Sequence, residues 1–369
     1  MGSNPLPNYL AACALRPERV LLVYSEETKR PKERLEATLR ERLGVEVPVG
    51  RDGSRCVPNA AEASAVEKIS RELPADARLN YTGGTKIMAT HARVAFKEAG
   101  GTPDRASYVD GARGIVRFDD GYPLALPDDC LDLDVVRQLH GLEPLSEWEP
   151  AEGGPSERDA VAVADAALDP ELKAPELPEQ LYRWTRDDKG EERRPKDLRD
   201  DPIHPGAFGL DLPDPIPGDG WTNKQIERWR DFLGGVWLDV WARQQVQAAL
   251  PAARVHAGVH VLRHNGRDFE VDVVAIGGHQ VRVVSCTTDR TLGLCKGKGF
   301  EVQARARQLG GDLASAALVC FLSDERVGKV ARDLESVWDE PNRPAVFGLS
   351  HLREWHAGDR HSLTRWATR

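Results

Sequence analysis

Hydrophobic and polar residues in the first third of the chain follow patterns that predict strands and helices in turn. Largely apolar runs at Arg19–Tyr24 and Arg78–Tyr81 are typical of strands buried on both faces of a sheet. Lys32–Leu43, between them, has the period of an amphipathic helix. Strands that alternate with helices indicate a doubly wound, Rossmann-like α/β domain, which we assign to residues 1–125.

A second ordered part covers residues 221–369. Asn223–Leu250 has the period of one or two helices, and Val255–Arg263 alternates as a strand. Asn265 and Gly266 then form a type I′ hairpin signal, and a second alternating stretch, a helix and a further strand follow. This order predicts an α/β core with a mixed sheet. The tryptophans of the helical stretch are predicted core residues: Trp229, Trp237 and Trp241.

Residues 126–220 have a different composition. They contain repeated prolines, the sequence Gly153-Gly-Pro155 and the charge-dense run Asp187–Asp201. Mixed charge with proline and few aliphatic residues is typical of a linker or a loosely structured insert, which we predict here.

Composition narrows the class of protein. The net charge of −9 argues against a protein that coats nucleic acid by bulk charge, but not against an enzyme that acts through one local metal ion. The chain has no apolar run long enough for a membrane span. Its six cysteines form no CxxC pair, so we expect reduced thiols in a cytoplasmic protein.

The stretch Phe269–Thr288 carries candidate chemistry. It alternates, turns at Gly277-Gly278 and alternates again, so Glu270 and Asp272 share one face of the first strand. Acids at the end of a sheet suit metal-dependent phosphodiester chemistry. The same pattern also fits an ordinary hairpin with one wet face.

A second motif, Thr82–Lys86, joins a predicted strand to a predicted helix. Its two glycines expose backbone N–H groups, and the helix N-terminus favours an anion, so a phosphate is a suitable ligand. The motif lacks the GxxxxGK[ST] spacing of a P-loop. A plain glycine-bearing turn is the alternative.

Taken together in chain order, these motifs resemble one family: the CRISPR ancillary nucleases with an N-terminal CARF domain and a C-terminal PD-(D/E)XK nuclease domain, a restriction-endonuclease-like fold. The most specific element is the string Asn80-x-Thr82-Gly-Gly-Thr-Lys86. The stretches that carry the resemblance are Asn4–Asn8, Arg19–Ser25, Leu79–Met88, Gly235–Asp239, Glu270–Asp272, Ser285–Cys286 and Phe300–Gly311.

The resemblance implies a homodimer that binds a cyclic oligoadenylate, in particular cyclic tetra-adenylate, between its two CARF domains. It also implies a metal-dependent endonuclease that this ligand activates to cut DNA, RNA or both in type III CRISPR defence. Carried over by position, the ligand-binding residues are Asn8, Ser25, Thr82, Gly83, Gly84, Thr85 and Lys86.

The chain departs from the family at the catalytic motif, where an acid is followed on the next strand by Glu-x-Lys or Ser-x-Lys. Asp272 fits the acid and Cys286 the residue that offers its carbonyl. Ser285 stands where a second carboxylate is common, and Thr287 stands where the lysine is expected. Threonine cannot supply a positive charge at neutral pH.

The sequence offers replacements for both groups. Glu301, at the start of the next predicted helix, is a second carboxylate, so that Asp272, Glu301 and Cys286 would hold a Mg²⁺ or Mn²⁺ ion. Lys296 or Lys298, in the glycine-rich stretch Gly293–Gly299 predicted as a loop, would supply the ammonium. Glu270 completes the catalytic candidates, and Asp239 is a spare carboxylate nearby.

Two other functions stay open on the sequence. Ser285 and Thr287 also fit a cyclic-oligoadenylate-binding sensor whose nuclease domain is catalytically degenerate. In a third reading, the CARF half slowly cleaves its own ligand.

Overall fold

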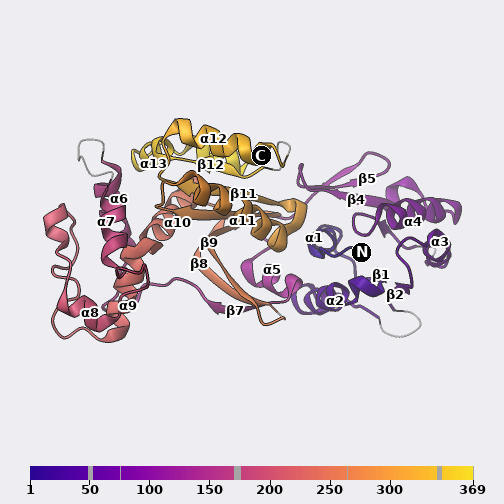
Figure 1. The fold of residues 1–369 in the computed structure, drawn as a ribbon. Helices are drawn as coiled ribbons and strands as arrows, with labels where there is room; N and C mark the ends of the chain where they lie inside the picture. The colour runs from indigo at the N-terminus through magenta and orange to yellow at the C-terminus, as the bar shows by residue number, and fades with distance from the viewer. Residues whose placement is uncertain (49–52, 75, 170–175, 264, 339–342, 369) are drawn as a thin grey trace.

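The computed structural model describes residues 1–48, 53–74, 76–169, 176–263, 265–338 and 343–368. It shows an N-terminal α/β half and a larger C-terminal half built around one sheet, with helix α5 (Leu133–His140) between them (Figure 1). None of the described helices combines the length and apolar character needed to cross a bilayer.

The N-terminal half contains two small sheets. Strands β1 (Val23–Ser25) and β2 (Arg55–Val57) pair in parallel. The second sheet has the order β3-β4-β5-β6, with β3 and β4 parallel and the other pairs antiparallel. The remaining elements of this half are α1 (Leu6–Leu15), η1 (Glu26–Thr28), α2 (Lys29–Leu43), α3 (Ala63–Arg71), β3 (Leu79–Asn80), α4 (Lys86–Glu98), η3 (Pro103–Arg105), β4 (Ala106–Asp110), β5 (Ile115–Phe118) and β6 (Pro123–Ala125).

The C-terminal half is organised around a six-stranded sheet with the order β12-β11-β10-β9-β8-β7. Neighbours from β7 to β10 are antiparallel, and β10, β11 and β12 are parallel, so the predicted mixed sheet is confirmed. The strands are β7 (Leu142–Ser146), β8 (Arg254–Arg263), β9 (Asp268–Gly277), β10 (Gln280–Thr287), β11 (Ala314–Cys320) and β12 (Ala345–Phe347).

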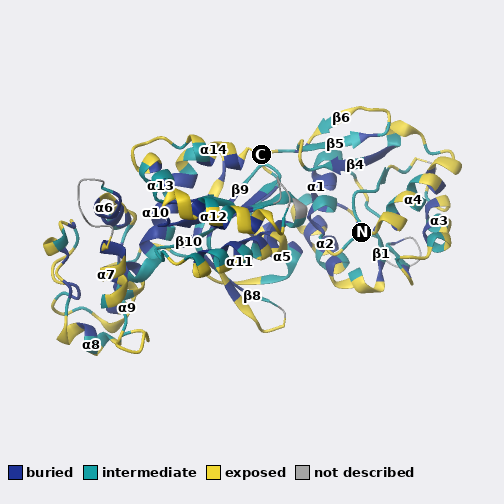
Figure 2. Cartoon of the chain, turned by 45° about the horizontal axis from the view of Figure 1, so that its top comes forward, coloured by how far each residue is buried: buried dark blue, intermediate teal, exposed yellow. Residues whose placement is uncertain are grey.

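Helices cover both faces of this sheet. One face packs on α10 (Trp237–Ala249), and α6 (Glu157–Leu168) packs against α10 rather than against the sheet. Figure 2 shows buried residues along α10. The three predicted core tryptophans are confirmed as buried in this core. The other face packs on α11 (Leu292–Gly310) and α5, in a core that is continuous with α1 and α2 of the N-terminal half. The two halves therefore share a hydrophobic core. The outer helices of the C-terminal half are α12 (Asp324–Glu335), α13 (Leu349–His356) and α14 (His361–Ala367).

The stretch 126–220, predicted as a linker or loose insert, is instead ordered in its described part. It supplies the edge strand β7 and several helices. Alanines occupy four of the six buried positions of α6, so the helix is only weakly hydrophobic in sequence although it packs closely on α10. The elements of this stretch and the next helix are α5, β7, α6, α7 (Leu177–Trp184), α8 (Pro195–Asp200), η4 (Pro205–Phe208) and α9 (Asn223–Asp231).

The prediction of a loop at Gly293–Gly299 is also wrong, because these residues form the first turns of α11. Glycine disfavours a helix interior, but a Cβ on Gly299 would lie 2.9 Å from Cδ1 of Leu334 on α12. The absent side chain lets α12 approach α11 closely, and that packing outweighs the low helix propensity.

Helix α6 offers a matched test of whether residues 126–220 belong to the folded core. Val163 is fully buried, whereas Val161 on the same helix is 36% exposed. Val163→Ala should lower the free energy of unfolding by about 2 kcal/mol, because two buried methyl groups and their packing are lost. Val161→Ala should change it by less than about 0.5 kcal/mol. Denaturant unfolding of both variants measures the difference, and equal losses would mean that α6 does not pack on the core.

Candidate functional site

Three side chains from three elements meet at one end of the large sheet. Asp239 lies in the first turn of α10, Asp272 on β9 and Cys286 on β10. One carboxylate oxygen of each aspartate and the Cys286 Sγ all lie within 4.8 Å of one another. We call these residues the acid cluster.

The strands hold Asp272 through the backbone of β10. Register pairs between β9 and β10 run only as far as Val273 and Val284, so Ser285 and Cys286 have no register partner on β9, although both still pair with β11. Asp272 Oδ2 accepts hydrogen bonds from the Cys286 N–H (2.6 Å) and the Ser285 hydroxyl (2.9 Å). Ser285 therefore orients the Asp272 carboxylate. It does not replace the second carboxylate that is common at its position in the family motif.

Asp239 reaches the cluster because the helix before it is broken. The π-helical turn η5 (Phe232–Val236) separates α9 from α10, and Gly235 departs from helical backbone (φ 157°, ψ −29°). Helix α10 thus starts anew beside the sheet, and the positive end of its dipole lies near the Asp239 carboxylate.

Burial dominates the electrostatics of the cluster. It raises the pKa of Asp239 well above its ordinary value, and the charges of Asp272 and Glu270 raise it further. Burial likewise raises the pKa of Asp272, while the nearby ammonium of Lys298 lowers it. Burial also raises the pKa of the Cys286 thiol, with Asp239 and Asp272 adding to the effect. The site contains several desolvated acids but only one ammonium, so its negative groups are not balanced by positive charge. A divalent cation would supply the missing charge, and the donor set therefore fits such an ion.

The two candidate lysines on α11 face different partners. Lys298 lies close enough to the cluster to lower the pKa of each of the two aspartates. Lys296, two residues earlier and therefore on the other side of the helix, pairs with Asp333 of α12 at 3.0 Å. Lys298 alone of the two brings an ammonium to the site.

The remaining predicted residues lie around the cluster. Glu301 is exposed on α11, pairs with Arg305 at 3.1 Å and is not one of the three donors within 4.8 Å of one another, but its charge is near enough to raise the pKa of Asp272. Glu270 is an exposed residue at the rim, and partial desolvation of its carboxyl, together with the charge of Asp272, raises its pKa. Thr287 uses its hydroxyl to accept the N–H of Asp289 (3.2 Å).

In the N-terminal half, the Thr82–Lys86 turn joins β3 to α4 as expected. The Thr82 hydroxyl donates to Asn80 (2.8 Å) and accepts from the Val109 N–H (2.7 Å), which fixes the turn. Thr85 caps α4 by accepting the Met88 N–H (3.2 Å). Both hydroxyls are thus occupied within the protein.

The groups left for a ligand are the glycine backbone, Lys86 and Asn8. Lys86 is exposed at the start of α4, and it makes no ion pair with any described residue. A Cβ on Gly83 would lie 2.7 Å from Nδ2 of Asn8, so glycine is needed there. That Asn8 Nδ2 is buried without a hydrogen-bond partner among the residues that the structure describes. Ser25 is almost fully buried, and its hydroxyl contacts Glu27 and Thr28.

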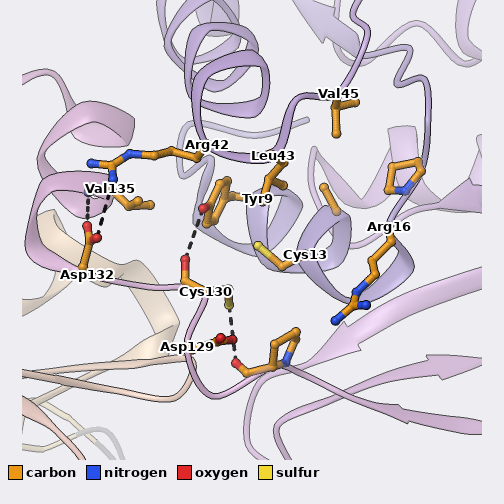
Figure 3. A pocket seen from close by; sticks show the side chains of 13 residues that line it. Tyr9, Cys13, Arg16, Arg42, Leu43, Val45, Asp129, Cys130, Asp132 and Val135 are labelled. Atoms are coloured by element: carbon orange, nitrogen blue, oxygen red, sulfur yellow. Dashed lines mark hydrogen bonds and ion pairs between the residues drawn. The ribbon is translucent and has the colours of Figure 1, made fainter.

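A separate cavity of about 530 Å³ lies between α1, α2 and the segment before α5 (Figure 3). Two thiols, Cys13 and Cys130, line it, and the Tyr9 hydroxyl donates to the Cys130 carbonyl (3.1 Å). Arg42 pairs there with Asp132 at 3.7 Å. None of the acid-cluster residues lines this cavity.

Sequence reasoning undervalued Asp239 and missed the ties between the two halves. The usable signal for Asp239 was the pair Gly234-Gly235, which permits a helix to break just before an acid. The ties are the contacts of Asn4 with Gly310 and of His279 with Gly111, which join residues far apart in the chain.

Comparison with known proteins establishes the fold. No protein-family model matches the chain, and no curated protein matches it. Among solved structures, protein VC1899 from Vibrio cholerae has 14% identity and a TM-score of 0.71, covering 100% of this chain and 97% of that one. Can2 from Sulfobacillus thermosulfidooxidans, in complex with cyclic tetra-adenylate, has 19% identity and a TM-score of 0.68, covering 99% and 97%.

A third structure is that of a type III CRISPR defence DNA nuclease activated by cyclic oligoadenylate. It has 18% identity and a TM-score of 0.55, covering 88% of this chain but 45% of that one. The likeness to protein VC1899 and to Can2 extends over the whole chain, and the predicted fold class, a Rossmann-like α/β half followed by an α/β half with a mixed sheet, is confirmed.

The raised pKa of Asp239 generates a prediction about stability. Because the fold favours the neutral carboxyl, ionised Asp239 destabilises the metal-free protein at neutral pH. Asp239→Asn should therefore raise the melting temperature by a few degrees in the presence of a chelator. The gain should shrink as the pH falls through the raised pKa, where the parent carboxyl becomes protonated. Thermal melts across pH test this, with Asp211→Asn, an exposed carboxylate, as the neutral control; a gain that does not change with pH would contradict it.

Proposed function

We propose that this protein is a metal-dependent endonuclease of type III CRISPR defence that a cyclic oligoadenylate activates. The observation that carries the proposal is the acid cluster with Lys298, at the end of a sheet in a chain that shares its whole fold with a protein bound to cyclic tetra-adenylate. Two half-buried carboxylates beside an ammonium are suited to bind a metal ion and to act on a phosphodiester.

In this proposal, cyclic tetra-adenylate binds between the N-terminal halves of a homodimer. The N–H groups of Gly83 and Gly84 and the N-terminus of α4 would receive its phosphates, and Lys86 would neutralise them. The unpartnered Nδ2 of Asn8 supports a polar ligand beside Gly83. Thr82, Thr85 and Ser25 would shape the site, since their hydroxyls already have partners within the protein.

In the nuclease half, Asp272 and Asp239 would hold a Mg²⁺ or Mn²⁺ ion, and Ser285 keeps the Asp272 carboxylate oriented. A bound divalent ion supplies acidity to coordinated water and neutralises charge on the scissile phosphate. Lys298 would provide, from a helix, the ammonium that Thr287 cannot provide from the strand. Glu270, at the open rim, is placed to contact substrate or water, and Glu301 is left with a peripheral role.

The contacts between the halves explain how a distant ligand would reach the acid cluster. Asn4 lies four residues before Asn8 and donates from Nδ2 to the Gly310 carbonyl (3.2 Å), at the end of the helix that carries Lys298. Its Oδ1 accepts the Leu6 N–H (3.0 Å), which ties this contact to the start of α1. Gly311 (φ 62°) has no Cβ to obstruct Asn4. A shift of α1 on ligand binding would therefore act directly on α11.

The catalytic assignment predicts a contrast between the two lysines of α11. With cyclic tetra-adenylate and Mn²⁺, Lys298→Ala should reduce cleavage of plasmid DNA or single-stranded RNA by roughly 100- to 1,000-fold, because the phosphate loses its positive partner. Lys296→Ala should cleave as the parent does, since Lys296 binds Asp333. Full activity of Lys298→Ala would remove it from the mechanism. Binding of the cyclic ligand without cleavage by any variant or the parent would instead support the sensor function.

The coupling assignment predicts a different defect for Asn4→Ala. Its affinity for cyclic tetra-adenylate should stay unchanged, while the stimulation of cleavage by that ligand should fall at least about fivefold. Calorimetry measures the affinity, and cleavage with and without ligand measures the stimulation. Ser3→Ala, an exposed neighbour, is the control. If Asn4→Ala is stimulated as strongly as the parent, the coupling does not run through this contact.

A further inference from the structure

The side chain of Cys286, and not only its backbone, belongs to the acid cluster. The Cys286 sulfur lies within 4.8 Å of a donor oxygen of each of the two aspartates. The residue is 6% exposed, and it packs with Val284 and Trp237 on the α10 side of the sheet. A buried sulfur beside two carboxylates is therefore a fixed feature of the site.

This donor set differs from one made of oxygens alone. Mg²⁺ takes oxygen ligands and usually keeps several waters, and it gains little from sulfur. Thiolate sulfur favours softer ions, and affinity along the divalent series rises from Mn²⁺ through Co²⁺. Two carboxylates with one thiolate carry three negative charges, which suits a borderline divalent ion.

We infer that the Cys286 Sγ is a direct ligand of the ion in the acid cluster, and that it makes this centre prefer Mn²⁺, Co²⁺ or Zn²⁺ to Mg²⁺. The inference rests on the proposed function for the identity of the cluster as the metal centre. Cys286 is then the residue that determines metal specificity.

Binding through sulfur is a simple exchange of a proton for a metal ion. The S–H bond breaks, the proton passes to solvent, and the sulfur lone pair forms the bond to the ion, so no oxidant or reductant is needed. The charge of the incoming ion favours the thiolate, which is the form of cysteine that binds metal.

Titration of the metal-free protein, residues 1–369, with Co²⁺ tests the inference without nucleic acid or cyclic ligand. We expect a near-ultraviolet thiolate-to-cobalt charge-transfer band that saturates at one ion per chain. Cys286→Ser should abolish the band and weaken Co²⁺ binding at least about tenfold, the loss caused by removing even an outer partner of a metal site. Cys13→Ser, a buried thiol in the other half, should leave both unchanged.

A second variant covers the case in which Cys286→Ser fails to fold. Cys286→Asp keeps a ligand but makes the donor set all oxygen, so calorimetry should show tighter Mg²⁺ binding and weaker Co²⁺ binding than in the parent. Co²⁺ binding without a charge-transfer band, or equal Mg²⁺ and Co²⁺ affinities in parent and Cys286→Asp, would overturn the inference while leaving the proposed nuclease intact. A charge-transfer band in a protein that cleaves nothing with any ion would contradict the proposed function and leave the ligand assignment standing.

Discussion

The packing of α11 on the large sheet is the constraint on which the rest of the structure depends. Near its start, this helix directs Lys298 toward the acid cluster and Lys296 toward α12. Its apolar side completes the core that β9 and β10 share with α1 and α5. At its end, the Gly310 carbonyl accepts the side-chain amide of Asn4. One rigid helix thus touches the candidate active site, the common core and the N-terminal half.

The acid cluster opposes this packing energetically. Placing Asp239 and Asp272 in a desolvated position costs stability, because neither the helix dipole nor one ammonium compensates two buried charges. The fold tolerates the cost because the tryptophan-rich core around α10 holds both elements in place. Destabilising repulsion between neighbouring carboxylates is typical of sites that bind a cation. A bound ion would attract both carboxylates and remove this repulsion, which would strengthen its binding.

The two halves are built as one body, which bears on regulation. Their hydrophobic cores are continuous, and polar contacts add to them where the turn between β4 and β5 meets the turn between β9 and β10. There the His279 Nε2–H donates to the Gly111 carbonyl (2.9 Å), and a Cβ on Gly114 would lie 2.6 Å from the His279 ring. A cavity of about 670 Å³ lies beside the same contact. A movement of one half would therefore act on the other through this shared core and these contacts.

The sequence by itself determined the elements whose signals are local. Period-two alternation predicted β8, β9 and β10, and the glycine-bearing turn before α4 and the buried tryptophans were also foreseen, because each depends on a few neighbouring residues. The tertiary structure alone decided which groups meet. It made the glycine-rich stretch a helix, because α12 needs the space beside Gly299. It ordered the described part of residues 126–220, because the alanines of α6 pack on α10. It also brought Asp239 to within 4.8 Å of Asp272 and Cys286, and it paired Lys296 with Asp333. Those choices depend on the distances between elements, which are set by packing between residues far apart in the chain.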